Sequence, residues 1–301
     1  MAQPGPRSLG FDRVLFALVT PIQRFVTSQR LRISCWDWGN PSAPTLLLVH
    51  GGRDHARSWD RIAEAFRDDY HVVALDLRGH GDSDWSIGGN YGLPDNALDV
   101  AAVIESSGAP ARILAHSYGG SVSLVTAGTF PALVSRLAVM EGTHSLNPPD
   151  QDHVGVEWMR NWARRLRGFE TQESRPYPSL QAAEARMREA NPRLPADFLP
   201  HLAAYASRPV EGGYMWKYDL WVNGRSSMEL RRDELPEFWE AVECPVLLVT
   251  GSESAAADRQ HPNPEAHLRE VRRVQIEGAG HWIHHDQKDA LLAELRPFFA
   301  E

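Results

Sequence analysis

The sequence predicts an α/β protein whose sheet is mostly parallel and doubly wound, with a mainly helical segment inserted into it. Short, unbroken apolar runs alternate with helix-compatible stretches in residues 30–142, and the alternation resumes in residues 243–301. Strands that are apolar along their whole length are typical of a parallel sheet covered by helices on both faces. Residues 143–242 contain no convincing strand and combine helical patterns with prolines and tryptophans. We therefore expect one core interrupted by a helical cap.

The expected elements can be placed in chain order. Residues 30–38 are rich in β-forming side chains and are expected to form an antiparallel strand or hairpin. Parallel strands are expected at residues 45–49, 72–75, 112–115, 137–140, 245–250 and 273–276. The helices of the core are expected at residues 58–66, 94–106, 121–127 and 289–298. Residues 1–29 would form an N-terminal extension, with a short amphipathic helix over residues 11–19.

The composition limits the partners that the protein could have. Of its 301 residues, 43% are hydrophobic and 23% are charged, and the net charge of −8 disfavours nucleic acid as a partner. No apolar stretch is long enough to span a bilayer, so we expect no membrane partner. The two cysteines, Cys35 and Cys244, are expected to be free thiols of a cytoplasmic protein. A homodimer is compatible with these features.

The strongest candidate for a catalytic group is Ser117. It lies in Ala115-His116-Ser117-Tyr118-Gly119-Gly120, between an expected strand and an expected helix. A serine at a sharp strand-to-helix turn has the geometry of a nucleophile elbow. The strained turn needs very small residues two positions before and two positions after the serine, where Ala115 and Gly119 stand. The sequence therefore predicts that Ser117 is a nucleophile.

A serine nucleophile needs a base, and His281 is the candidate. It lies in Gly278-Ala279-Gly280-His281-Trp282, after the last expected strand. Parallel sheets place their sites beyond the carboxyl ends of the strands, where Ser117 is also expected. The neighbouring His284, His285 and Asp286 are not expected to bind a metal, because adjacent side chains diverge.

A third motif, His50-Gly51-Gly52, follows the strand expected at residues 45–49. We expect the backbone amides of Gly52 and Tyr118 to form an oxyanion hole, since both come after strands that end near the nucleophile. Residues 76–83 form a polar, tightly turned loop next to this site. In that loop we expect Asp76 and Arg78 to have structural rather than catalytic roles.

Taken together, these motifs resemble those of the α/β-hydrolase superfamily, in a serine esterase-like form with a helical cap. The resemblance extends from about residue 30 to residue 301 and rests on His50-Gly51-Gly52, residues 76–83, the Ser117 elbow and Gly280-His281. It implies an α/β-hydrolase fold, a triad of serine, acid and histidine, and a cap over residues 143–242 that shapes the substrate pocket.

The acid of the triad departs from the family pattern, because Ser254 stands where an aspartate is usual. Three carboxylates could replace it. Glu253 is adjacent, but its side chain is expected to point away. Asp258 lies on a loop whose path the sequence does not define. Glu141 ends the strand that follows the nucleophile helix, a placement similar to that in certain haloalkane dehalogenases, and is the preferred candidate.

These residues predict a carboxylic-ester hydrolase that forms an acyl-enzyme and needs no metal and no cofactor. Dehalogenation and epoxide hydrolysis are disfavoured, because that chemistry uses an aspartate nucleophile. Hydrolysis of a carbon–carbon bond, lactone or thioester, cofactor-free haloperoxidase-like chemistry and a non-catalytic binding role remain alternatives. The expected partner is a small ester with an apolar portion. The aromatic residues of the cap either line its pocket or pack the cap onto the core, namely Trp158, Trp162, Trp216, Trp221 and Trp239.

Overall fold

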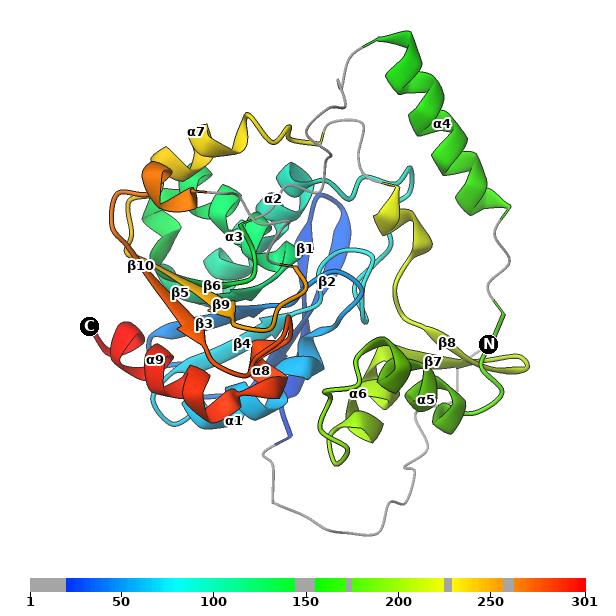
Figure 1. Cartoon of the computed structure of the whole chain (residues 1–301), viewed down its shortest axis with the longest axis horizontal. Helices are drawn as coiled ribbons and strands as arrows, with labels where there is room; N and C mark the ends of the chain where they lie inside the picture. Colours follow the sequence, from blue (N-terminus) through cyan, green and yellow to red (C-terminus); the bar gives the residue numbers. More distant parts are fainter. Residues whose placement is uncertain (1–19, 144–154, 172–174, 225–228, 257–262) are drawn as a thin grey trace.

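The computed structural model describes residues 20–143, 155–171, 175–224, 229–256 and 263–301. Its centre is an eight-stranded sheet with the strand order β1-β2-β4-β3-β5-β6-β9-β10 (Figure 1). Helices cover both faces of this sheet, so the predicted fold class is confirmed. Within the described ranges, no helix has both the length and the apolar character needed to cross a bilayer.

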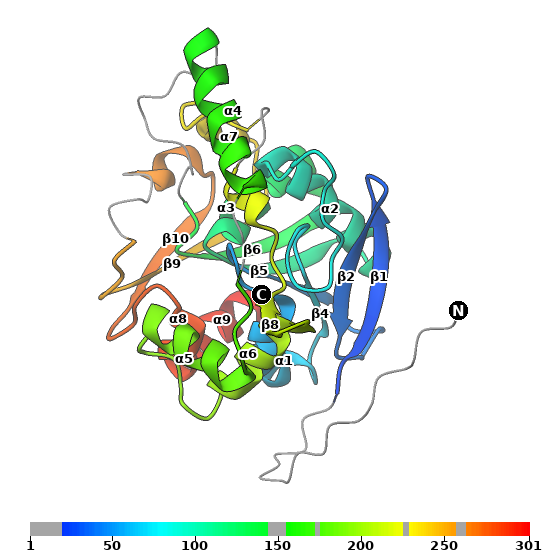
Figure 2. The same ribbon diagram turned by 90° about the vertical axis from the view of Figure 1, so that its right-hand side faces the viewer.

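Six of the eight strands run parallel. They are β4 (His71–Leu75), β3 (Thr45–Val49), β5 (Ala111–His116), β6 (Val134–Met140), β9 (Val246–Gly251) and β10 (Val271–Ile276). An antiparallel hairpin of β1 (Ile22–Ser28) and β2 (Leu31–Asp37) extends the sheet beside β4. Figure 2 shows this hairpin at one edge and β10 at the other. The carboxyl ends of β3, β5, β6, β9 and β10 therefore meet along one rim, which is where the motifs lie.

Successive side chains of β3 point to opposite faces of the sheet and so belong to the two separate layers of the core. Leu46 and Leu48 face the layer formed by α1 (Asp60–Phe66) and α9 (Lys288–Ala300). Leu47 and Val49 face the opposite layer, which contains α2 (Leu93–Ser107) and α3 (Tyr118–Thr129). These four side chains are fully buried, and that of Thr45, the first residue of β3, is buried as well. This burial on both faces explains why the strand is apolar along its whole length.

The segment between β6 and β9 is mainly helical. Its helices are α4 (Val156–Glu170), α5 (Leu180–Ala190), α6 (Leu199–Ala206) and α7 (Leu235–Glu240). α4 has no buried residue, and it stands apart from the sheet in Figure 1. α5 and α6 pack against each other beside a small hairpin of β7 (Ser207–Val210) and β8 (Gly213–Trp216).

Three details differ from the sequence-based expectation. Residues 22–28, assigned to the N-terminal extension, form strand β1, and the helix expected over residues 11–19 lies outside the described residues. The β7–β8 hairpin occupies a region where no strand was expected, because two four-residue strands that pair with each other leave a weak sequence pattern. Finally, α7 packs on helix α3 of the core although it belongs to residues 143–242.

Candidate active site

Ser117 lies between the last residue of β5 and the first residue of α3. Its backbone adopts φ 50° and ψ −120°, a conformation that L-residues rarely occupy. Close packing maintains the turn, because a Cβ atom on Gly119 would lie 2.4 Å from the carbonyl oxygen of His50. The Ser117 N–H also donates to the Met140 carbonyl at 2.8 Å. The turn thus has the strained geometry that the sequence predicted.

His281 lies in the loop after β10, and its Nε2 atom is 3.0 Å from Ser117 Oγ. Two contacts position this loop. The Gly280 N–H donates to Asp286 Oδ2 at 2.7 Å, and His116 Nε2 donates to the His281 carbonyl at 2.9 Å. His116, the residue before Ser117, is thereby hydrogen-bonded to the backbone of His281.

Glu141 approaches the other side of the His281 ring from the end of β6. Its Oε2 atom is 3.6 Å from His281 Nδ1, and the residue is 2% exposed. The Gly251 N–H donates to Oε1 and the Ser254 hydroxyl donates to Oε2, each at 2.8 Å. Like Ser117, Glu141 has a positive φ, 55°, at the end of its strand. The carboxylate is therefore fixed by the end of β9 and oriented toward the histidine.

The other two acid candidates are not brought to this point. The Glu253 carboxylate is 53% exposed and pairs with Arg193. Asp258 lies outside the described residues. Ser254 occupies the position at which the family pattern places an aspartate, and its hydroxyl contacts Glu141 directly.

His50 fixes the orientation of the peptide between Gly51 and Gly52. The Leu77 N–H donates to His50 Nε2 at 3.0 Å, so Nδ1 carries the ring proton and donates to the Gly51 carbonyl at 2.7 Å. The C=O and N–H of a trans peptide point in opposite directions, so the Gly52 N–H is turned away from His50. Burial lowers the pKa of His50 to about 3, which keeps this neutral tautomer.

Tyr118, the second expected oxyanion donor, is the first residue of α3, and such an N–H has no acceptor within its own helix. Its phenol donates to the Tyr91 carbonyl at 2.8 Å and accepts from the Asn96 amide at 3.0 Å. A Cβ atom on Gly52 would lie 3.9 Å from Tyr118 Cβ, which places the two backbones side by side. The structure thus brings both predicted donors to the same place.

The loop after β4 supports this rim. The Arg78 guanidinium makes two hydrogen bonds to the buried Asp99 carboxylate, at 2.6 and 2.8 Å. Asp76 accepts from the Ala56 and Asp82 backbone amides, and desolvation of its carboxylate raises its pKa to about 6. Both side chains are engaged in holding loops together.

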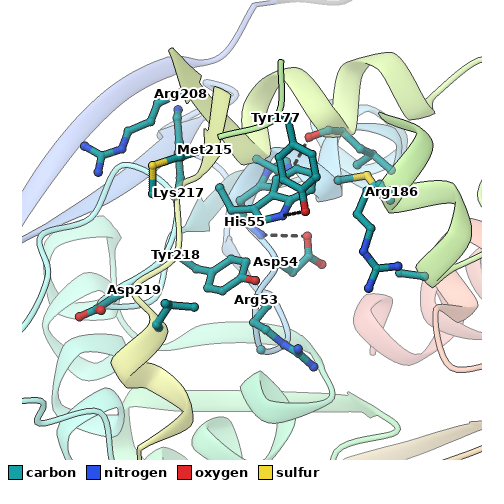
Figure 3. Close-up of a pocket in the computed structure, with 18 of the residues that line it drawn as sticks. Arg53, Asp54, His55, Tyr177, Arg186, Arg208, Met215, Lys217, Tyr218 and Asp219 are labelled. Carbon is teal, nitrogen blue, oxygen red and sulfur yellow. Dashed lines mark hydrogen bonds between the residues drawn. The ribbon is translucent and has the colours of Figure 1, made fainter. Parts of the chain in front are cut away.

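A cavity of about 800 Å³ adjoins the loop at residues 52–55 and is lined by Gly52 and by residues of the inserted segment (Figure 3). Two of the five singled-out tryptophans, Trp216 and Trp221, line it. Trp158 and Trp162 instead stack on each other in α4, and Trp239 is buried in the core. The sequence pattern did not reveal that Arg53, Arg175, Arg186, Arg208 and Lys217 also line this cavity.

Among the described residues, one group brings potential metal ligands together, formed by Asp54, His116 and His284. Their ligand atoms lie within 4.8 Å of one another, and neither ring nitrogen of the buried His284 has a hydrogen-bond partner in the described part of the chain. Tetrahedral zinc with bonds of about 2.1 Å needs ligand atoms about 3.4 Å apart, so these side chains would have to move closer together. Asp286 is engaged with Gly280 and does not belong to this group.

Comparison with known proteins identifies the family. A family model described as alpha/beta hydrolase fold matches residues 44–288. The chain belongs to this family of hydrolases. The hydrolase is 29% identical to an esterase of Mycobacterium tuberculosis, over 92% of this chain and 89% of that protein. It is 25% identical to 2-(acetamidomethylene)succinate hydrolase of Mesorhizobium japonicum, over 92% of this chain and 95% of that protein.

Solved structures agree with this assignment of the fold. The thioesterase domain from the curacin biosynthetic pathway is 24% identical and has a TM-score of 0.80, with 91% of this hydrolase and 99% of that chain covered. A hypothetical protein of Pseudomonas aeruginosa is 26% identical, with a TM-score of 0.79 and coverage of 94% and 100%. The family predicted from the motifs is confirmed.

Proposed function

We propose that this hydrolase cleaves carboxylic esters through an acyl-enzyme, with Ser117 as nucleophile, His281 as base and Glu141 as the acid of the triad. One observation carries the proposal: Ser117 Oγ and the Glu141 carboxylate face opposite nitrogens of the same imidazole, at 3.0 and 3.6 Å. This is the arrangement in which a histidine can take a proton on one side while a carboxylate stabilises the resulting positive charge on the other.

The reaction follows from these positions. Ser117 Oγ attacks the ester carbonyl while His281 Nε2 accepts the hydroxyl proton, and the N–H groups of Gly52 and Tyr118 donate to the oxyanion that forms. His281 then gives the proton to the departing alkoxide, which leaves as an alcohol. A water molecule, deprotonated by His281, attacks the acyl-enzyme and releases the carboxylic acid.

The serine favours acyl chemistry over epoxide opening, the activity named for a relative from Caenorhabditis elegans that is 24% identical. Attack of Ser117 on an epoxide would produce an alkyl ether. That ether has no carbonyl carbon for water to attack, so the enzyme could not be regenerated. An ester intermediate can be hydrolysed by the same oxyanion hole that helped to form it.

Part of the inserted segment acts as a cap in this proposal. Residues 175–224 contribute most of the cavity wall. Gly52 also lines the cavity, and a Cβ atom on the preceding Gly51 would lie 3.1 Å from Ser117 Cβ. The aromatic part of the wall, which includes Tyr177, Trp216 and Tyr218, suits the apolar portion of an ester substrate.

Covalent labelling tests the proposal. We expect a fluorophosphonate probe to label the wild-type protein, and Ser117→Ala to abolish the labelling and the hydrolysis of p-nitrophenyl esters. Ser106→Ala is the matched control, because Ser106 lies on α2 and its hydroxyl donates to the Val103 carbonyl. A folded wild-type protein that is neither labelled nor active on esters, lactones or thioesters would refute the proposal.

A further inference from the structure

The cavity beside the loop at residues 52–55 is rich in positive charge, although the whole chain has a net charge of −8. Two carboxylates, Asp54 and Asp219, line the same cavity. The cationic side chains of its wall outnumber them and come from separate segments of the chain, namely Arg53, Arg175, Arg186, Arg208 and Lys217. A local charge opposite in sign to that of the protein points to an anionic ligand.

The two carboxylates of the wall are engaged elsewhere. Asp219 accepts a hydrogen bond from the Tyr91 hydroxyl and another from the Trp221 N–H. Asp54 accepts from the His55 N–H at 2.8 Å and from the Ser58 hydroxyl at 3.1 Å. Neither carboxylate forms a salt bridge with a cationic group of the wall within the described part of the chain. The cationic groups of the wall therefore have no salt-bridge partner among the described carboxylates that line the cavity with them.

The cationic side chains differ in what they already bind. Lys217 pairs with Asp82 at 2.7 Å, and the Arg186 guanidinium is 3.2 Å from Glu189 in an exposed pair. Arg208 lies over the Trp85 ring. For Arg53, no carboxylate among the described residues lies within salt-bridge distance. Arg53 thus lacks a counter-ion among the described residues. It is also the cation of the wall that lies nearest in sequence to Gly52, the proposed oxyanion donor.

The backbone of Arg53 supports a functional role. Its φ of 61° lies in the left-handed region, which is unfavourable for a non-glycine residue. Strain of this kind persists where the surrounding structure over-determines it, and it is common at ligand sites. The arginine follows Gly52 directly, so its side chain starts beside the expected position of the oxyanion.

Arg186 and Tyr218 share this part of the cavity with Arg53 (Figure 3). Burial raises the pKa of the Tyr218 hydroxyl, and the positive charges of Arg53 and Arg186 act against that rise. Both guanidinium groups are therefore close enough to the hydroxyl to influence its ionisation. Two guanidinium groups and a phenol that line the same cavity are suitable donors for a carboxylate.

We propose that the natural substrate is an ester bearing a carboxylate, and that Arg53, Arg186 and the Tyr218 hydroxyl bind this carboxylate while the aromatic wall contacts the apolar portion. The inference rests on the proposed function, because it assigns a substrate class to the same site. It requires no further catalytic group: the carboxylate is held by charge and hydrogen bonds, and the ester is cleaved by the proposed triad.

Matched esters test the inference. Mono-p-nitrophenyl adipate has a carboxylate on its acyl part, and the corresponding primary amide is a neutral isostere. 4-Acetoxybenzoate and 4-acetoxybenzamide form the equivalent pair for a carboxylate on the alcohol part. We expect kcat/KM, corrected for spontaneous hydrolysis, to favour the carboxylate over the amide by about 10- to 100-fold in at least one pair.

Arginine variants then test which side chains cause the preference for the carboxylate substrate. Arg53→Gln is expected to lower the carboxylate-to-amide ratio of kcat/KM by about tenfold or more, and Arg186→Gln is expected to lower the same ratio by a smaller factor. Arg272→Gln is the control, because Arg272 pairs with Glu294 at the far edge of the sheet and does not line the cavity. Equal activity on both members of each pair, or an unchanged ratio in Arg53→Gln, would overturn the inference.

A binding measurement separates this inference from the proposed function. Calorimetric titration of Ser117→Ala with adipate needs no turnover, and we expect binding that Arg53→Gln weakens by about tenfold. Adipate binding without fluorophosphonate labelling of the wild type would refute the proposed ester hydrolysis and retain the carboxylate site. Labelling and ester hydrolysis without adipate binding or a carboxylate preference would refute the carboxylate site alone.

Discussion

The Ser254 hydroxyl donates a 2.8 Å hydrogen bond to the Glu141 carboxylate, across the gap between the ends of β9 and β6. Glu141 follows β6 and Ser254 follows β9, and these are the two strand ends of this fold from which the acid of a triad could come. Here the carboxylate comes from β6, and β9 contributes a hydroxyl and the Gly251 N–H that hold it in place.

The first prediction concerns Glu141. Glu141→Gln removes the negative charge that would stabilise the protonated His281, so kcat is expected to fall by about three to four orders of magnitude. Steady-state kinetics on p-nitrophenyl esters measure this loss. Glu253→Gln is the matched control and is expected to keep the wild-type kcat, because its carboxylate is exposed and faces Arg193. Wild-type kcat in Glu141→Gln would show that another residue, such as Asp258, is the acid.

The second prediction concerns a transfer of the triad carboxylate from position 141, after β6, to position 254, after β9. Because Ser254 Oγ already contacts the Glu141 carboxylate, an aspartate at position 254 would place a carboxylate close to His281 Nδ1. Adding Ser254→Asp to Glu141→Gln is therefore expected to raise kcat at least about tenfold above Glu141→Gln alone. Ser254→Asn in the same background supplies a similar shape without the charge, and is expected to give no recovery. Equal kcat values for these two double variants would contradict the prediction.

The third prediction concerns the packing of the elbow. Gly119→Ala would place a methyl group 2.4 Å from the His50 carbonyl oxygen and 2.7 Å from the Val49 carbonyl oxygen, both of which are backbone atoms. We expect a loss of about 3 kcal/mol or more in the free energy of unfolding, together with a loss of activity. Ala115→Gly, the change at the other small position, is expected to cost about 1 kcal/mol. Urea denaturation compares the two, and a stable, active Gly119→Ala would mean that the turn is looser than described.

The fourth prediction concerns pH and Asp54. Desolvation of its carboxylate raises the pKa of Asp54 from 3.8 to about 7 in the folded state. Between these values the folded protein binds more protons than the unfolded chain, so the contribution of Asp54 to stability falls as pH rises from 4 to 7. Asp54→Asn removes this dependence. Its free energy of unfolding relative to wild type is expected to rise by up to about 4 kcal/mol between pH 4 and pH 8.

Denaturation curves at several pH values test the direction in which this difference in unfolding free energy changes with pH. The matched variant is Asp289→Asn, whose side chain is 91% exposed and should give a difference from wild type that does not change with pH. A constant difference for Asp54→Asn as well would mean that Asp54 is ionised without penalty in the folded protein.

The parallel core was predictable from sequence because central strands such as β3 and β4 bury both of their faces and so leave unbroken apolar runs. The Ser117 elbow could be found for a related reason, since Ser117 directly follows the buried strand β5. His281 was found instead from the glycine-containing turn that follows β10. Strand β1 was missed because it lies at the sheet edge, where even the apolar side chains of Ile22 and Phe25 are exposed. The pattern there is mixed, and the expected boundary at residue 30 falls inside the hairpin.

The cavity was harder to predict than the triad. Arg53, Arg186 and Tyr218 come from separate segments, and no spacing in the sequence indicates that they meet. The contact between Ser254 and Glu141 was missed for the same reason. A serine in place of the expected aspartate indicated that the acid had to come from elsewhere, but not that the serine would still bind it.

The placement of Glu141 has a consequence for how the protein would lose activity on heating. The Ser117 N–H bonds to the Met140 carbonyl and the Glu141 N–H bonds to the Val249 carbonyl, so both residues belong to the hydrogen-bond ladder of the central strands. Local opening of a surface loop leaves such a ladder intact. Nucleophile and proposed acid therefore separate when the sheet itself unfolds. We expect the amide protons of Ser117 and Glu141 to exchange with solvent as slowly as those of the core. Activity would be lost before global unfolding only through a part of the site outside this ladder, such as the loop that carries His281.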